Sequence, residues 1–207
     1  KAQHGMCVKW LANATRAELN GCTTGSKEFN MIPKAGPGEF RDRNVRIHAD
    51  TPASIMLVFQ AIFPFLVFAG DANEEPITLT IMGGTNVMFS PSYDYIDQVV
   101  LPCLELLGVP KVERKLEFRG WSTGGQQIGS IKFKFTPLAR HQSLDATLWP
   151  KPTEADSIKR IDITMVVPRN FQESLKASLK FELDLVFPGV DIHNAIEEDS
   201  RHPARLY

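Results

Sequence analysis

The sequence has little cysteine, no excess of charge of either sign and no apolar run of membrane-spanning length. Its three cysteines are Cys7, Cys22 and Cys103, with no Cys-x-x-Cys pair among them, which argues against a disulfide framework and a thiolate zinc site. We therefore expect a reducing compartment, the nucleus or the cytoplasm. The 23 basic and 24 acidic residues give a net charge of -1, which neither requires nor excludes a nucleic-acid partner.

The longest apolar run, IMLVFQAIFPFLVFA, covers residues 55–69. It is shorter than the roughly 20 residues that span a bilayer, and Gln60 and Pro64 interrupt it, so we expect a buried helix and no membrane partner. A buried amide needs hydrogen-bond partners, and Pro64 removes the amide that would bond the Gln60 carbonyl. We expect a kinked helix in which Gln60 either ties the helix to a sheet or contacts a ligand.

Signals for metal and phosphate binding are weak. None of the five histidines stands in an HxxxH or HExxH spacing, so we expect no metal ligands in this chain. Basic residues gather around a glycine-rich loop and again on a later hairpin, and such strips either bind phosphate or are solvated faces. These residues are Lys34, Arg41, Arg43 and Arg46, then Arg114, Lys115, Arg119, Lys132 and Lys134.

Apolar periodicity and turn residues predict a mixed α/β fold. From residue 45 the order is β-α-β-α-β-β, and the preceding helix and strand resemble the end of the same unit, so we expect a repeated module. Asp50, Thr51 or Ser54 can cap the second helix, and Ser92 the third. The expected elements are helices over 4–19, 55–69 and 92–107, and strands over 27–32, 45–48, 77–82, 111–118 and 128–135.

We divide the chain into a core over residues 1–139, a polar, proline-rich linker over 140–157 and a further small domain over 158–207. Within the core, residues 1–43 would be the tail of one module and 44–139 a complete module. Both ends look cut, so we expect a fragment or a protein that has lost flanking modules. In the small domain we expect a strand over 161–167, a helix over 170–182 and a strand over 183–187.

A glycine pair follows the strand over 77–82, in the order Gly83, Gly84, Thr85 and Asn86. Ligands of α/β sheets bind beyond the carboxyl ends of strands, and glycine lets backbone amides approach a ligand closely. The alternative is a tight turn from strand to loop. The chain contains neither GxGxxG nor GxxxxGK(S/T), so no Rossmann or P-loop site is indicated.

Three stretches together resemble the RNA 3'-terminal phosphate cyclase family. They are GGTNVMFSPSYDYI, the preceding TPASIMLVFQAIFPFLVFA with its single glutamine, and the later LEFRGWSTGGQQIGSIKF. The resemblance is strong over residues 1–138 and fainter over 158–207, which resembles the beginning of the family's inserted small domain. It implies an α+β sandwich of tandem β-α-β-α-β-β modules, each a sheet packed on two helices.

The resemblance also implies a reaction, its cofactors and its partners. The family uses ATP to convert the 3'-phosphate at an RNA end into a 2',3'-cyclic phosphodiester, with Mg2+ neutralising the phosphates. A histidine takes the adenylate from ATP and passes it to the RNA phosphate, and the neighbouring 2'-hydroxyl then displaces it. The expected partners are therefore ATP and RNA 3' ends.

Carried over by position, the resemblance implies a nucleotide pocket. Gln3 matches a glutamine near the catalytic pocket, and Gln60 matches the helix glutamine of the adenylate site. Pro91 and Tyr95 match residues that pack around the adenine, where an aromatic ring can stack on the base. One wall of that pocket would be the loop that contains Gly83, Gly84 and Asn86.

The chain also departs from the family pattern. The family's nucleophilic histidine matches none of the five histidines here and would lie beyond Tyr207. Gln126 replaces the usual third glycine of the hairpin, and Ser92 replaces the second proline of the adenine loop. We therefore do not expect the chain alone to complete the reaction. The alternative is a non-catalytic, cyclase-like scaffold of the ribosome-biogenesis type that binds RNA or protein.

Overall fold

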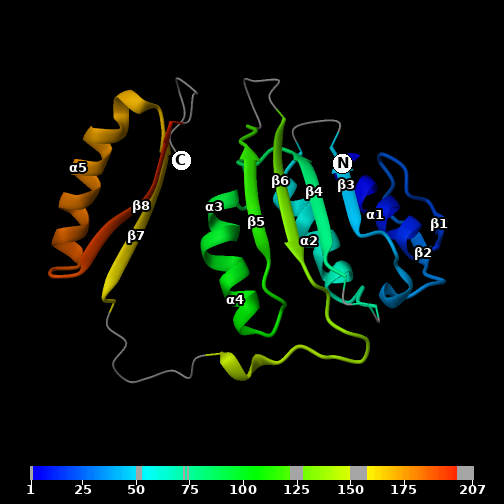
Figure 1. Cartoon of the computed structure of the whole chain (residues 1–207). Coiled ribbons are helices and arrows are strands. Elements are labelled where there is room, and N and C mark those ends of the chain that lie inside the picture. Colours follow the sequence, from blue (N-terminus) through cyan, green and yellow to red (C-terminus); the bar gives the residue numbers. More distant parts are fainter. Residues whose placement is uncertain are drawn as a thin grey trace. The chain divides into compact units, whose positions relative to one another are not determined.

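The computed structural model describes residues 2–49, 53–71, 73, 75–121, 128–149 and 158–199. The chain separates into two compact units, residues 1–149 and 150–207. Figure 1 shows the strands and helices of each unit. The assignment of these parts to modules, a linker and an inserted domain stays a prediction.

A four-stranded sheet organises the first unit, in the order β3-β4-β6-β5. β3 (Asn44–His48) runs parallel to β4 (Ile77–Gly83). β6 (Gly129–Phe135) is antiparallel to both β4 and β5 (Glu113–Phe118). Buried and half-buried residues alternate along β4, because successive side chains of a strand point to opposite faces of the sheet.

Helix α2 (Ile55–Val67) packs its apolar side against one face of this sheet, and Figure 1 shows it behind the strands. The Phe59 and Phe133 rings join helix to sheet with centroids 4.4 Å apart. Ser54 caps α2 by accepting a hydrogen bond from the Leu57 amide at 3.2 Å. The core between them consists of Ile55, Met56, Val58, Phe59, Ile62, Phe63, Leu66, Ile77, Leu79, Ile81, Ile131 and Phe133.

A second helical segment crosses from the end of β4 to β5. It consists of α3 (Tyr93–Tyr95), a π-helical turn η2 (Ile96–Val100) and α4 (Leu101–Leu106). The predicted cap is confirmed, because the Ser92 hydroxyl accepts a hydrogen bond from the Tyr95 amide at 3.1 Å. Ile96 and Leu101 are fully buried and complete the core.

The amino-terminal part differs from the predicted helix over 4–19. α1 (Ala2–Ala14) ends earlier, because Arg16 adopts a positive φ of 51° that reverses the chain. The residues that follow form a two-stranded antiparallel ribbon of β1 (Glu18–Asn20) and β2 (Asn30–Ile32). Short 3-10 turns, η1 (Pro37–Glu39) and η3 (Ala146–Leu148), complete the unit.

The second unit contains a parallel pair of strands and one helix. β7 (Arg160–Val167) pairs with β8 (Asp191–Asp199), and α5 (Arg169–Val186) connects them. The predicted strand over 183–187 is wrong, because the helix continues to Val186 and the chain turns at Gly189, with φ +78°. Leu179, Leu183 and Val186 stand at i, i+4 and i+7, a helical spacing.

The mixed α/β fold class, with a sheet packed on helices in an α+β sandwich, is confirmed. Within the described part of the chain, no helix is both long enough and apolar enough to cross a membrane.

Candidate functional site

Three glycines meet backbone to backbone at the carboxyl end of β4. A Cβ on Gly83 would lie 2.5 Å from the Ala53 carbonyl oxygen. A Cβ on Gly120 would lie 2.2 Å from the Gly129 amide nitrogen and 2.5 Å from the Gly83 oxygen. Real Cβ atoms do not approach other atoms so closely, so these glycines are required by the packing of the protein's own backbone.

Backbone amides that follow β4 are bonded within the protein. The Gly84 amide donates to the Ala53 carbonyl at 2.7 Å, and the Thr85 amide donates to the Gly120 carbonyl at 2.8 Å. The Asn86 amide also points at Gly120, at 3.3 Å. These amides are therefore occupied in this conformation, and of the two readings of the glycine pair the tight, packed turn fits the geometry. A direct nucleotide contact from Gly83, Gly84 or Asn86 stays a prediction.

A buried polar network holds this loop. Arg119 donates two hydrogen bonds to Asp94, at 2.8 and 3.0 Å, and a third to the Asn86 side-chain oxygen at 3.1 Å. The Thr85 hydroxyl donates to the same Asn86 oxygen at 2.8 Å. Both charged side chains are about 10% exposed. Such a paired, bonded arrangement is rigid, because either charge alone would be strongly unfavourable at this depth.

Helices α2 and α3 begin against the same loop. The Ile55 amide at the start of α2 donates to the Gly84 carbonyl at 2.9 Å. The Tyr93 amide at the start of α3 donates to the Thr85 carbonyl at 3.1 Å. The Gln3 side chain reaches the loop before α2, where its amide donates to the Ser54 carbonyl at 2.9 Å. The strand end thus brings Gln3, Gly84 and the two helix starts together.

The exposure of the predicted pocket residues differs from the expectation. Gln60 is exposed on α2, so the predicted buried amide tying the helix to the sheet is wrong: Gln60 lies on the same outward side of the helix as Ala61 and Pro64. Tyr95 is 51% exposed, and Pro91 and Gln3 are half-buried. A nucleotide contact from any of these side chains stays a prediction.

Arg119, which the sequence analysis places in a basic strip on the later hairpin, instead forms a structural pair with Asp94. Both residues stand in stretches already singled out, Asp94 in PSYDY and Arg119 in RGW. They are 25 residues apart in sequence, so no local pattern indicates that they form a pair. The hairpin tip at residues 122–127, including Gln126, lies outside the described residues, as do the possible caps Asp50 and Thr51.

A protein-family model described as RNA 3'-terminal phosphate cyclase matches residues 1–193. The chain belongs to the RNA 3'-terminal phosphate cyclase family. A protein of that name from Thermococcus sibiricus is 32% identical over 206 residues, which are 98% of this chain and 55% of the relative. Relatives with the same name from Pyrococcus furiosus and Methanosarcina barkeri are 36% and 38% identical over 64% and 63% of this chain, and 36% and 37% of their own lengths. The chain thus spans about half, or less, of the relatives it matches.

Metal ligands are not grouped in the described part of this cyclase-family chain. Among those residues, no three His, Cys, Asp or Glu side chains come together in a way that could hold a metal ion. Since Mg2+ is usually held by one or two carboxylates together with substrate phosphates, the expected Mg2+ stays a prediction.

Several of the basic residues singled out in the sequence form ion pairs within the fold of this family member. Arg43 pairs with Asp71 at 2.6 Å and also donates to the Ala69 carbonyl at 3.0 Å, and Lys34 pairs with Glu18 at 2.5 Å. The two hairpin arginines enter ion pairs as well, Arg114 with Asp97 and Glu105, and Arg119 with Asp94. Of the predicted cluster around the glycine-rich loop, Lys34 and Arg43 are thus in ion pairs, whereas Arg46 and the lysines of β5 and β6 are exposed on the sheet.

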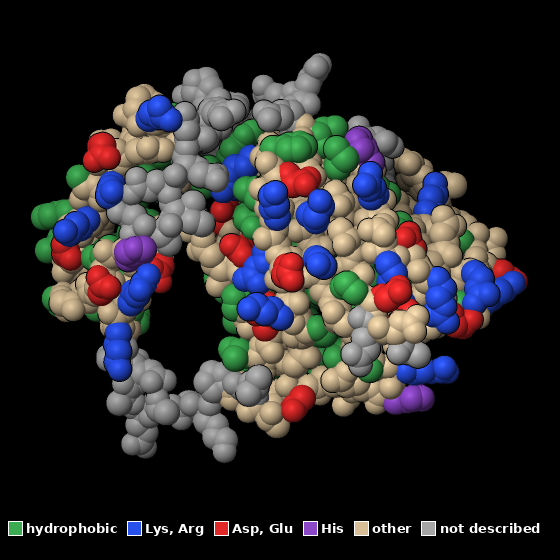
Figure 2. Space-filling model, viewed as in Figure 1, with side chains coloured by type: hydrophobic (Ala, Val, Ile, Leu, Met, Phe, Trp, Pro, Cys, Tyr) green, Lys and Arg blue, Asp and Glu red, His purple; other side chains and the backbone are tan. Residues whose placement is uncertain are grey.

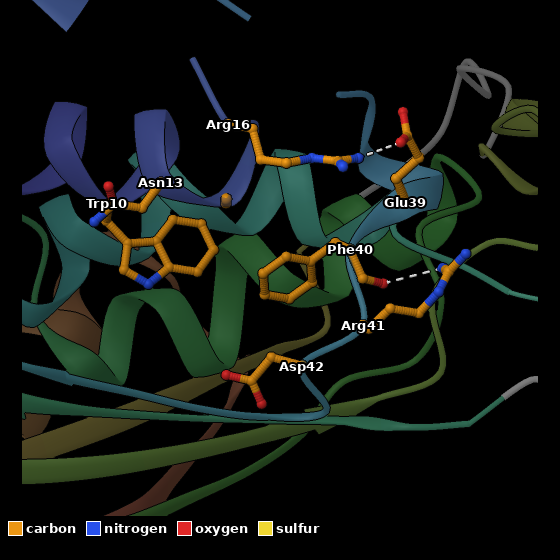
Figure 3. Close-up of a pocket in the computed structure, with 8 residues that line it drawn as sticks. Trp10, Asn13, Arg16, Glu39, Phe40, Arg41 and Asp42 are labelled. Atoms are coloured by element: carbon orange, nitrogen blue, oxygen red, sulfur yellow. Dashed lines mark hydrogen bonds and ion pairs between the residues drawn. The ribbon is translucent and has the colours of Figure 1, made fainter. Parts of the chain in front are cut away.

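One hollow of about 430 Å³ lies between α1 and the turn η1. Figure 3 shows the rings of Trp10 and Phe40 along it and Arg16 reaching to Glu39, with which it forms an ion pair. Trp10, Phe40 and Phe65 pack together with ring centroids 5.6 to 6.0 Å apart. This aromatic cluster joins α1 to α2, so the hollow is a by-product of that packing rather than a set of converging reactive groups.

Proposed function

We propose that this protein takes part in RNA 3'-terminal phosphate cyclisation, the ATP-dependent conversion of an RNA 3'-phosphate into a 2',3'-cyclic phosphodiester through an adenylated enzyme. ATP and RNA 3' ends are its substrates under this proposal, and the nucleus or the cytoplasm is its location. The observation that carries the proposal is the family match over residues 1–193, since it spans both units of the chain.

The site geometry supports a particular role for this chain. Gly83, Gly120 and Gly129 and the Arg119–Asp94 pair give a rigid strand end. The candidate nucleotide contacts are the exposed Gln60 and Tyr95 and the half-buried Pro91. We propose that the Tyr95 ring and Pro91 contact the adenine, because every base offers a π-face to an aromatic ring, and that the Gln60 amide hydrogen-bonds the nucleotide.

Gln3 has a positioning role in this proposal. Its side-chain amide donates to the Ser54 carbonyl, while Ile55, the first residue of α2, donates to Gly84. Gln3 therefore fixes the start of the helix that carries Gln60. The adenylated histidine is proposed to lie outside this chain, because none of its five histidines matches that residue. The chain would then supply part of the nucleotide site and depend on further polypeptide for the chemistry.

The test is cyclisation by the protein in the form in which cells make it. RNA with a 3'-phosphate is incubated with the protein, ATP and magnesium chloride, and the ends are then treated with phosphatase. The expected result is phosphatase-resistant ends that form only when ATP is present, with RNA bearing a 3'-hydroxyl as the control. The 207-residue chain tested alone is expected to leave the ends sensitive.

Ends that stay phosphatase-sensitive with the cellular form would refute the cyclase proposal. If that form also ends near Tyr207 and still binds RNA, the non-catalytic scaffold becomes the better reading. The length of the cellular form, measured by mass spectrometry, separates these cases.

A further inference from the structure

The four-stranded sheet has one face that α2 does not cover. Side chains on this face, such as Arg46, Thr80 and Lys132, are exposed or half-buried, whereas their neighbours on the strands, such as Ile47, Leu79 and Phe133, are buried. Figure 2 shows basic side chains gathered over the strands on this side. A hollow of about 470 Å³ lies in this face.

The strand register aligns three cations in one row across all four strands. Arg46 of β3 pairs with Thr80 of β4, Thr80 with Lys132 of β6, and Lys132 with Lys115 of β5. Paired residues of neighbouring strands point to the same face and lie about 5 Å apart. The row is therefore a line of positive charge perpendicular to the strands, with one hydroxyl between the cations.

This row is electrostatically unfavourable without a further anion. Lys115 and Lys132 are directly opposite each other, and like charges in that position destabilise a sheet. Glu117 compensates in part, because it lies 3.5 Å from the Lys132 ammonium and accepts a hydrogen bond from Ser130. The next row differs, since Lys134 is directly opposite Glu113. An excess of positive charge is thus confined to the row of Arg46, Lys132 and Lys115.

A second row that contains an exposed aromatic residue runs beside the cationic one. His48 pairs with Met82, Met82 with Ser130, and Ser130 with Phe118, with a register irregularity between Leu116 and Phe118 on β5. Phe118 is 42% exposed, and it lines the hollow together with His48, Met82 and residues of the cationic row. On β3, β4 and β6 the two rows are two residues apart, which corresponds to about 6.6 Å. A row of cations beside an exposed aromatic side chain suits a nucleotide chain, with phosphates on the cations and a base on the ring.

We propose that this face binds single-stranded RNA, with phosphates along Arg46, Lys132 and Lys115 and a base against Phe118 and His48. The choice of RNA over another polyanion rests on the proposed function, but the surface is separate from the predicted nucleotide pocket and from the reaction. It would hold the body of a substrate strand rather than its reacting end.

The test measures binding of a fluorescent 12-nucleotide RNA with a 3'-hydroxyl, in the absence of ATP, by anisotropy at several salt concentrations. The variant R46A/K115A removes two cations and leaves the Lys132–Glu117 pair intact. Its RNA binding is expected to weaken. The slope of log K against log salt is expected to become less negative by about 1.4, because each lost phosphate contact on a single strand accounts for about 0.7. The control K9A/K27A removes equal charge at two exposed positions elsewhere.

Two single substitutions examine the rest of the surface. Phe118→Ala is expected to weaken RNA binding roughly fivefold or more through lost base stacking, whereas Phe181→Ala, an exposed ring of α5, is expected to leave it unchanged. Glu117→Gln is expected to tighten binding, because it removes the carboxylate nearest the phosphates.

Three outcomes would overturn the proposal. The first is an R46A/K115A affinity and salt slope equal to those of the K9A/K27A control. The second is competition by poly-glutamate as strong as by unlabelled RNA, which would assign the face to an acidic protein. The third is unchanged binding in Phe118→Ala. The RNA used cannot be cyclised and ATP is absent, so a failed cyclase assay and a failure of this surface are separate results.

Discussion

Two arginines of the same sheet show how differently one residue type is used in this chain. Arg119 lies mostly buried at the end of β5 and donates hydrogen bonds to Asp94 and Asn86. Arg46 lies on the open face of β3, in a row with other cations. The first has fixed partners and supports the fold, whereas the second has charge available for something outside the protein. The burial of a side chain and its partners within the protein, rather than its residue type, distinguish side chains that support the fold from candidates for ligand binding.

The two arginines can be distinguished by removing the charge of each in turn. Arg119→Met leaves Asp94 buried without its bidentate partner, which we expect to lower the free energy of unfolding by about 3–5 kcal/mol. Arg46→Met on the open face is expected to change it by less than about 0.5 kcal/mol. Urea denaturation followed by circular dichroism measures both. Equal losses for the two variants would contradict the distinction.

The same contrast applies to glycines. Gly120→Ala places a Cβ within 2.2 to 2.8 Å of three backbone atoms, so strand ends have to separate, at a cost of about 1–3 kcal/mol. Gly36 has no atom near its Cβ position among the described residues, and Gly36→Ala is expected to be nearly neutral. The midpoint of urea unfolding compares them. A neutral Gly120→Ala would mean that the strand end is not close-packed.

The fold was largely accessible from the sequence because its elements are strongly periodic. The alternation along Ile77–Gly83 and the apolar side of Ile55–Val67 place the sheet and its main helix. The early end of α1 was not accessible, because it depends on the positive φ of Arg16. The predicted strand over 183–187 is wrong because a short apolar stretch fits both the helical and the strand period. In the structure these residues continue the helical spacing of α5 as far as Val186.

The site was harder to predict from the sequence than the fold, because it depends on contacts between residues that are far apart in the chain. Asp94 and Arg119 are 25 residues apart in sequence, and only the fold brings them into contact. The row of Arg46, Lys132 and Lys115 likewise exists only in one strand register, since a shift of one residue would send Lys132 to the other face. Gln60 was expected to be buried because its neighbours are apolar, yet it occupies the outward side of α2.

The Arg43–Asp71 pair is nearly as buried as the Arg119–Asp94 pair, and its contribution to stability can be tested through pH. A hydrogen bond from Arg43 is the largest cause that lowers the pKa of Asp71 below its usual value. A lowered pKa in the folded state stabilises the fold above the unfolded pKa of about 3.9, and this contribution is lost as pH falls through the folded pKa. Asp71→Asn is therefore expected to melt below the parent at pH 7, with the difference shrinking toward pH 3.

Melting temperatures across pH 7 to 3 measure this effect. Asp184→Asn, at an exposed position of α5, is the matched control. A difference between Asp71→Asn and the parent that stays constant with pH would mean that the Arg43–Asp71 pair does not contribute through ionisation.

Gln60 gives the smallest expected effect on stability and the most informative one on function. Its side chain is exposed, so Gln60→Ala is expected to change the free energy of unfolding by less than about 0.5 kcal/mol. If it contacts the nucleotide, the same change removes a hydrogen bond worth about 0.5–1.5 kcal/mol and weakens ATP binding about two- to tenfold. Calorimetric titration of ATP measures this, with Gln172→Ala on α5 as the control. Unchanged ATP affinity with lowered stability would return Gln60 to a purely structural role and leave Tyr95 and Pro91 as the remaining candidates.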